Sequence, residues 1–239
     1  MKKVYNSIVV ATYNGERYIK EQIDSIIENM GENDELIISD DGSTDKTIEI
    51  INNYMEKDDR IHFFNGPRLG IKQNFANGIK EAKGKYIFLS DQDDVWVKDK
   101  IKTIDKYFED TNCNLILHNA NIVDENLVKS GNTFFEFRNS KSGIIRNIYK
   151  NSYIGCCMAF KGELKEHILP IPNNIEMHDQ WIGILAEKYG KVIFLNKCLI
   201  DYRRHGDNVS NMHHYPLKKM IKNRLIFIKE LIFEKRRRQ

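Results

Sequence analysis

Three carboxylates, those of Asp91, Asp93 and Asp94, stand within four positions of one another, directly after the apolar run 86–89. That run has the length and composition of a buried strand, so the acids are expected at a strand exit. Acids this close repel one another and are stabilised by water or by a shared cation. A hard divalent metal is the natural cation for oxygen ligands. The alternative is a solvated acidic turn that caps the following helix.

Two other polar clusters follow predicted strands in the same way. Residues 12–15 (Thr-Tyr-Asn-Gly) come after the strand-like segment 7–11, and residues 40–45 (Asp-Asp-Gly-Ser-Thr-Asp) come after 35–39. Each cluster alone is explained by a turn or a helix cap. In an open parallel sheet, however, the carboxyl ends of the strands are where ligands bind. Three such clusters on one edge therefore indicate a binding site.

The elements that must position these clusters alternate regularly in the first half of the chain. Strands are expected at 7–11, 35–39, 61–64, 85–89 and 115–117, and helices at 15–30, 43–55, 72–82 and 97–110. Four strand–helix units in a row predict an α/β fold with a doubly wound, mostly parallel sheet and right-handed crossovers.

The alternation weakens after about residue 120. The polar segment 124–151 indicates a long loop or a β-excursion, and it is followed by an expected strand at 153–160, a helix at 178–189 and a last strand at 191–195. No internal repeat or low-complexity linker interrupts the chain, which favours one domain over residues 1–214.

Composition narrows the class of protein. The chain has 239 residues, of which 41% are hydrophobic and 30% charged, as in a soluble globular protein. No run approaches the roughly 20 apolar residues of a membrane span, and the start of the chain does not resemble a signal peptide. The four cysteines lack metal-ligand spacing and are expected to be reduced thiols, with Cys156 and Cys157 in the core. A cytoplasmic location is therefore expected.

The net charge of +3 is unevenly distributed: residues 215–239 carry nine Lys and Arg against two Glu, which leaves −4 for residues 1–214. Apolar residues recur in this tail at helical spacing, at Leu217, Met220, Ile221, Leu225, Ile228, Leu231 and Ile232. A basic amphipathic helix over 215–239 predicts contact with the inner face of an anionic membrane. A helix packed on the domain with a solvated face explains the pattern equally well. No nucleic-acid-binding pattern accompanies the charge.

The three clusters, in this order, resemble family 2 glycosyltransferases of the GT-A fold. The similarity covers roughly residues 5–212, and the motif 90–94 with Val95-Trp96, together with 70–75, resembles the bacterial rhamnosyltransferase-like branch. The resemblance implies a nucleotide-sugar half over about 1–112 and an acceptor half over about 113–214. It also implies inverting transfer of a sugar from a nucleoside diphosphate to a hydroxyl.

The resemblance assigns the donor side of the site. It implies a divalent metal at Asp93 and Asp91, with His205 as a third ligand that favours Mn²⁺ slightly over Mg²⁺. The implied nucleotide-sugar contacts are Thr12, Tyr13, Asn14, Asp40, Asp41, Lys72, Asn74, Asp91 and Arg203. Many members carry an Arg-Asn pair on the helix before the metal strand, where this chain has Phe75-Ala76. That contact therefore falls to Lys72 or Arg68, or is absent.

The resemblance also assigns the acceptor side. An inverting transfer needs a base that takes the proton of the attacking hydroxyl, and the motif that supplies it matches Asp179. An aspartate at the start of a helix is also a favourable cap, and the two roles can coexist. The implied acceptor contacts are Gly155, Cys156, His178 and Trp181. We therefore expect a dTDP- or UDP-sugar donor, first dTDP-L-rhamnose, and a saccharide or lipid-linked saccharide acceptor in bacterial cell-surface polysaccharide synthesis. The alternatives are a sugar nucleotidyltransferase and a non-enzymatic carbohydrate-binding protein.

Overall fold

The computed structural model describes residues 4–206 and 216–236. Its strands form one nine-stranded sheet of order β3-β2-β1-β4-β8-β6-β9-β5, with β7 paired to β6. The strands are β1 (Asn6–Thr12), β2 (Glu35–Asp40), β3 (Ile61–Asn65), β4 (Tyr86–Ser90), β5 (Val95–Trp96), β6 (Leu115–Val123), β7 (Lys129–Thr133), β8 (Met158–Lys161) and β9 (Val192–Arg203). The helices are α1 (Ile19–Ile27), α2 (Thr47–Met55), α3 (Ile71–Glu81), α4 (Lys100–Thr111), α5 (Phe134–Arg138), α6 (Ile144–Tyr149), α7 (Lys165–Ile168), α8 (His178–Tyr189) and α9 (Leu217–Arg236), with 3₁₀ turns at Gly155–Cys157 and Gly162–Leu164.

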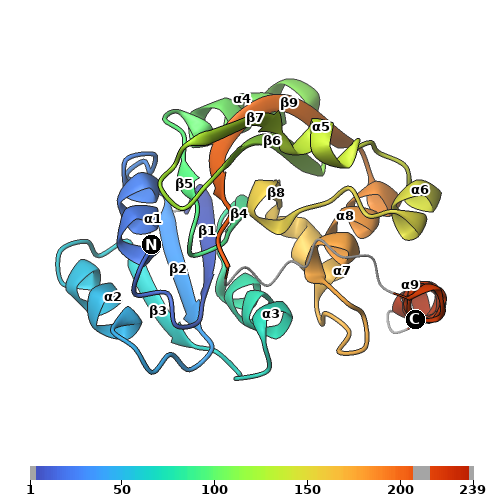
Figure 1. Cartoon of the computed structure of the whole chain (residues 1–239), viewed down its shortest axis with the longest axis horizontal. Helices are drawn as coiled ribbons and strands as arrows, with labels where there is room; N and C mark the ends of the chain where they lie inside the picture. The colour runs from blue at the N-terminus through green and yellow to red at the C-terminus, as the bar shows by residue number, and fades with distance from the viewer. Residues whose placement is uncertain (1–3, 207–215, 237–239) are drawn as a thin grey trace.

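The first half is a parallel sheet covered on both faces. Strands β3, β2, β1 and β4 are parallel neighbours, and they lie between α1 and α2 on one side and α3 on the other (Figure 1). Every residue of β1, β2 and β4 is buried, as expected for strands with helices on both faces. On α3, Gly78 allows close approach to the sheet, because a Cβ there would stand 2.5 Å from Val9. The expected α/β class and mostly parallel sheet are confirmed.

The second half extends the same sheet. Strand β8 runs antiparallel between β4 and β6, and β9 runs parallel to β6. The two-residue strand β5 follows the acidic cluster and pairs antiparallel with the end of β9, Val95 with Asp201. This short pairing fixes the acidic loop beside Arg203 and His205, which are more than 100 residues away in sequence.

Several expected boundaries were wrong for identifiable reasons. Strand β6 extends to Val123 and not Leu117, because the polar residues His118 and Asn119 are buried in it and interrupt the apolar pattern. Strand β9 continues past Asn196 to Arg203, because the exposed residues Asn196 and Lys197 interrupt its apolar pattern without ending the strand. The expected strand 153–160 begins only at Met158, because the preceding residues form a 3₁₀ turn where β8 enters between β4 and β6.

The helices occur in the expected order, but several of them begin later than expected. Helix α8 has the expected bounds, whereas α1, α2 and α4 start three or four residues later than expected. The segment 124–151 holds β7, α5 and α6 in place of a single loop or β-excursion. The expected C-terminal helix is present as α9. No helix among the described residues combines the length and apolar character needed to cross a membrane.

Candidate active site

The carboxyl ends of β1, β2 and β4 lie side by side. Thr12 pairs with Asp40, and Ser90 pairs with Val10 two residues before the end of β1. The three polar clusters of the sequence therefore meet at one edge of the sheet. This is the edge where ligands bind in open parallel sheets.

The Asp40 carboxylate organises the loop after β2. It accepts hydrogen bonds from the Gly42 and Ser43 backbone N–H groups at 3.0 and 2.7 Å, and from the Ser43 and Thr12 hydroxyls at 2.5 and 2.8 Å. Asp40 is buried, whereas Asp41 is half-buried and accepts from the backbone of Gly70 at 2.7 Å. Both carboxylates are thus held by the loops that frame the edge. A contact to a nucleobase stays a prediction for both.

The segment after β1 is fixed by side chains from the neighbouring loops. The amide of Asn14 accepts from the Thr44 N–H at 2.8 Å, and Gln92 of the acidic loop contacts the Tyr13 backbone N–H and carbonyl at 2.9 and 3.1 Å. The ring of Tyr13 is 57% exposed at this edge. A rigid backbone with an exposed aromatic ring is a suitable stacking surface for a nucleobase.

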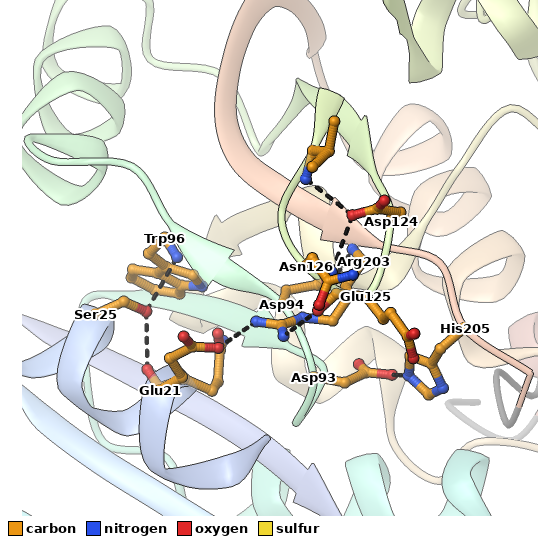
Figure 2. Close-up of polar contacts among 12 residues, drawn as sticks. Glu21, Ser25, Asp93, Asp94, Trp96, Asp124, Glu125, Asn126, Arg203 and His205 are labelled. Atoms are coloured by element: carbon orange, nitrogen blue, oxygen red, sulfur yellow. Dashed lines mark hydrogen bonds and ion pairs between the residues drawn. The ribbon is translucent and has the colours of Figure 1, made fainter. Parts of the chain in front are cut away.

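The structure brings Asp93 and His205 together. Their side chains meet with Nε2 of His205 2.8 Å from Oδ2 of Asp93 (Figure 2). His205 belongs to the polar segment after β9, whose continuation from Asp207 lies outside the described residues. A carboxylate and an imidazole in contact are two of the ligands that Mn²⁺ accepts.

The other two acids of the cluster lie close to Cys156. Ligand atoms of Asp91, Asp94 and Cys156 are all within 4.8 Å of one another. Burial and the charge of Asp93 raise the pKa of Asp91 to about 7 and that of Asp94 well above its usual range. Such shifts mark negative charge that has no sufficient counter-ion, and a divalent cation would offset it. Among the described residues, the donor atoms that lie close enough together to hold a divalent metal are therefore those of Asp91, Asp94 and Cys156, and a metal held by Asp91, Asp93 and His205 stays a prediction.

One buried cation stands beside this cluster and was not expected. Lys100 is fully buried; its Nζ lies 3.8 Å from the centre of the Trp96 ring and 3.4 Å from the Cys156 carbonyl oxygen. Burial lowers its pKa to about 8, and the acids Asp94 and Asp91 oppose that shift. At neutral pH the ammonium is still mostly charged, so it offsets part of the repulsion in the acidic cluster.

Arg203 ties the end of β9 to two other elements. Its guanidinium donates to the Glu21 carboxylate of α1 and, at 3.0 Å, to the Glu125 carbonyl, while its backbone N–H donates to Asp94 at 3.0 Å (Figure 2). The side chain is buried. These contacts hold the chain two residues before His205. The diphosphate contact expected of Arg203 stays a prediction.

Tyr18 is a further residue at this site that its sequence context did not predict. Its ring lies 4.8 Å from the His205 ring, centre to centre, and the Arg203 guanidinium carbon lies 4.7 Å from its centre. Aromatic and cation–π contacts of this kind fix side-chain orientation. Tyr18 therefore orients the imidazole that meets Asp93.

Asp179 lies in the first turn of α8, as expected. Its Oδ1 accepts from the Gln180 backbone N–H at 2.5 Å and from the Asn151 amide at 3.4 Å. Burial raises the pKa of Asp179 to about 6, against these hydrogen bonds and the charge of Arg138. The negative charge of Asp179 contributes to the raised pKa of Asp91, so the two carboxylates lie within electrostatic range. A carboxylate with a pKa near 6 is ionised at neutral pH and can accept a proton.

We expect the turnover rate to fall at acidic pH. Only the ionised form of Asp179 accepts a proton, and a pKa of about 6 means that this form is lost as the pH falls through 6. With saturating Mn²⁺, donor and acceptor, kcat should fall about tenfold per pH unit below pH 6. A flat profile between pH 5 and 7 would contradict this assignment.

His178 is held without a hydrogen bond to either ring nitrogen. The ring is 2% exposed, stacks on Phe75 at 4.3 Å between centres, and both Nδ1 and Nε2 lack a partner. Burial lowers its pKa to about 3, so the ring is neutral. Unsatisfied buried polar atoms are costly, and a ligand hydroxyl would satisfy one. The acceptor contact expected of His178 stays a prediction.

Because Gly155 has no side chain, the His178 ring can pack directly against its backbone. A Cβ on Gly155 would stand 2.7 Å from Nε2, so Gly155→Ala should displace the ring. We expect kcat/KM for the acceptor to fall about tenfold or more, because small displacements of positioning groups are costly. The donor KM should not change. Gly31→Ala is the matched control, since its Cβ would make only an ordinary 3.4 Å contact; equal acceptor kinetics in both variants would contradict the role of Gly155.

Three expected site residues have their polar groups engaged within the protein. Lys72 donates to the carbonyls of Asn173 and Ile175 at 2.6 Å. The amide of Asn74 is buried and donates to the ends of β1 and β2. Trp181 is 1% exposed and donates to the Ile168 carbonyl at 2.9 Å, so its side chain belongs to the core. Ligand contacts by Lys72, Asn74 and Trp181 stay predictions.

Comparison with known proteins identifies the family. The sequence profile of glycosyl transferase family 2 matches residues 7–168. The chain belongs to this family. It is 25% identical to TuaG of Bacillus subtilis, a protein named as a teichuronic acid biosynthesis glycosyltransferase, over 89% of this chain and 84% of TuaG. It is 29% identical to the dTDP-rhamnosyl transferase RfbG of Shigella flexneri, over 90% of this chain and 80% of RfbG.

Solved structures of glycosyltransferases share the fold. The Staphylococcus aureus TarS fragment 1–349 in complex with UDP-GlcNAc superimposes with a TM-score of 0.74 at 19% identity, over 92% of this chain and 64% of the TarS fragment. The mannosyltransferase PcManGT of Pyrobaculum calidifontis, in complex with GDP-Man and Mn²⁺, gives a TM-score of 0.60 at 17% identity, over 81% of this chain and 54% of PcManGT. The expected GT-A fold and transferase class are confirmed for this family 2 glycosyltransferase.

Proposed function

We propose that this glycosyltransferase is an inverting, metal-dependent enzyme that transfers a sugar from a dTDP- or UDP-sugar to a saccharide hydroxyl. The observation that carries the proposal is the contact of Asp93 with His205 beside Asp91, within electrostatic range of the ionisable Asp179. Two carboxylates and an imidazole provide a cation site on the donor side. A buried acid with a pKa of about 6 provides a base on the acceptor side.

A divalent metal bound by Asp91, Asp93 and His205 would neutralise charge on the diphosphate leaving group as a Lewis acid. The protein's own residues supply the remaining steps. Tyr18 and Arg203 hold His205 in place, and the loops of Asp40 and Asn14 hold the edge rigid where the nucleoside is expected. Rigid placement of this kind lowers the entropy lost on reaching the transition state.

Asp179 takes the proton of the acceptor hydroxyl. As the hydroxyl oxygen forms its bond to the anomeric carbon, the bond from that carbon to the diphosphate oxygen breaks, and the electron pair leaves with the diphosphate. Attack and departure on opposite faces of the sugar invert the anomeric centre. The position of Asp179 at a helix N-terminus opposes the effect of burial and favours its ionised form.

The donor and the acceptor are inferred from the relatives. The match to a dTDP-rhamnosyl transferase makes dTDP-L-rhamnose the first donor to test, and the complex of TarS with UDP-GlcNAc makes UDP-sugars the second. The name of TuaG supports a role in synthesis of a cell-surface polysaccharide. A sugar nucleotidyltransferase is less well supported, because the loop after β1 is neither glycine-rich nor strongly basic.

Calorimetric titration with a panel of nucleotide sugars in Mn²⁺, followed by mass spectrometry of products, tests the proposal. A glycosyltransferase binds one or two donors and yields a free nucleoside diphosphate and an extended saccharide. Release of pyrophosphate would identify a nucleotidyltransferase. Saccharide binding without turnover of any donor would identify a carbohydrate-binding protein.

A further inference from the structure

Helix α9 has an exposed apolar stripe. Leu217, Ile221, Leu225, Ile228 and Ile232 are 68%, 48%, 63%, 39% and 56% exposed. At 3.6 residues per turn their positions fall within an arc of about 80° on the helix surface. Contiguous apolar surface of this kind on a folded protein marks a contact site.

The opposite face of α9 is anchored to the domain. Phe227 is buried against Trp181, with ring centres 5.9 Å apart. Both glutamates of the helix are also turned inward: Glu230 accepts from Asn174 at 2.8 Å, and Glu234 accepts from Lys188 at 2.6 Å. The helix is therefore a packed part of the fold, and its two acids are withdrawn from the exposed face.

The exposed face is consequently basic as well as apolar. Lys218, Lys222 and Lys229 are exposed and lie next to the apolar stripe on the helix wheel. No glutamate or aspartate of α9 is exposed among residues 217–234. An anionic lipid bilayer has an apolar interior and negatively charged headgroups. It is therefore complementary to an apolar stripe that is bordered by cations.

Helix α6 continues this surface toward the candidate active site. Ile145 and Tyr149 are 85% and 71% exposed. Arg224 of α9 donates to the Tyr149 carbonyl at 2.7 Å, and its guanidinium carbon lies 4.2 Å from the centre of the Tyr149 ring. Two residues later, Asn151 contacts the Asp179 carboxylate. Helix α9 thus contacts the end of α6, and Asn151, two residues beyond that end, contacts the expected base. Figure 1 shows α6, α8 and α9 on the same side of the molecule.

We propose that the exposed faces of α6 and α9, here called the α6–α9 surface, bind an anionic membrane surface and bring the Asp179 side of the site to an acceptor carried by lipid. The membrane contact stands independently of the proposed function, and only the lipid-borne acceptor rests on it. Because α9 packs on Trp181, its deletion would expose the core, so substitutions on the exposed face give a cleaner test than truncation.

The test is sedimentation of the full chain, without donor, with vesicles of phosphatidylcholine alone or with 30% phosphatidylglycerol. We expect at least tenfold stronger partition onto the anionic vesicles. The triple variant Leu217→Ser, Ile221→Ser, Leu225→Ser should weaken it tenfold or more, and the triple variant Lys218→Glu, Lys222→Glu, Lys229→Glu should abolish the preference for anionic lipid. All six side chains are exposed, so the fold should be retained, as circular dichroism will show.

Substitutions at exposed sites away from the α6–α9 surface control for a change of charge and for loss of an apolar side chain. Lys102→Glu with Lys106→Glu on the exposed side of α4, and Met55→Ser at the end of α2, should leave partition onto the vesicles unchanged.

Equal partition of wild type and both triple variants, or no vesicle binding by wild type, would overturn the proposal. So would a wild-type dimer, measured by light scattering, that becomes a monomer in the Leu217 variant without loss of vesicle binding, since the stripe would then be an interface between two copies. Failure of every donor in the calorimetric panel would overturn the proposed function and leave the vesicle result standing.

Discussion

Asp179→Asn is expected to lower kcat about 100-fold or more, because general-base catalysis contributes 10²–10⁴ in rate. This corresponds to roughly 2.7 kcal/mol or more of transition-state stabilisation. An asparagine oxygen can still accept from the Gln180 N–H, so the helix start and the fold should be preserved. Donor affinity, measured by calorimetry, should change little, since Asp179 is proposed to act on the acceptor.

Glu176→Gln is the matched control for Asp179→Asn. Glu176 is three residues before Asp179, and its charge contributes to the raised pKa of that carboxyl. Removing this charge should leave kcat at pH 7.5 nearly unchanged and shift the acidic limb of the profile to slightly lower pH. If Asp179→Asn turns over normally, Asp179 is a helix cap and another residue is the base.

Asp93→Asn is expected to lower kcat/KM about 1,000-fold, because Lewis-acid stabilisation by a metal is worth several kcal/mol. The amide retains hydrogen-bonding capacity toward His205 but loses the charge that holds a divalent cation. EDTA should have the same effect on the wild-type enzyme, and added Mn²⁺ should restore activity. Donor turnover and the Kd for Mn²⁺ are both measured, so that loss of metal is distinguished from loss of fold.

Asp99→Asn provides the matched change six residues away. Asp99 is exposed and has a positive φ of 62°, a conformation that asparagine adopts readily. Its substitution should leave metal affinity and turnover at the wild-type values. Wild-type activity that survives complete chelation would show that the enzyme requires no metal.

The sequence predicted the sheet well where local patterns and long-range packing agree. The apolar runs 36–38 and 86–89 have no polar interruption, and β2 and β4 lie within one residue of the expected bounds. Strand β6 was predicted too short, because burial of Asn119 is compensated by hydrogen bonds to Asn196 and Phe135 that only the folded sheet provides. Hydrogen bonds of this kind join residues that are distant in sequence, so a short stretch of sequence does not reveal them.

The candidate site was predictable to the extent that it lies at strand ends. The clusters at Thr12, Asp40 and Asp91 follow from the rule for parallel sheets. The contact of Asp93 with His205 spans 112 residues and was expected only from the family resemblance. Lys100 could not be recognised, because a lysine in the first turn of a predicted amphipathic helix is normally exposed, and only the packing of Trp96 and Cys156 buries it.

The proposed mechanism requires a cation shared by Asp93 and His205, with Asp179 facing that cation. Anomalous diffraction from crystals grown with Mn²⁺ and UDP tests this directly. The proposed mechanism predicts one manganese peak bound by both side chains and by the diphosphate, with the Asp179 carboxylate on the acceptor side of the same edge. A peak bound by Asp94 and Cys156 without His205, or a nucleotide bound with no manganese, would contradict it.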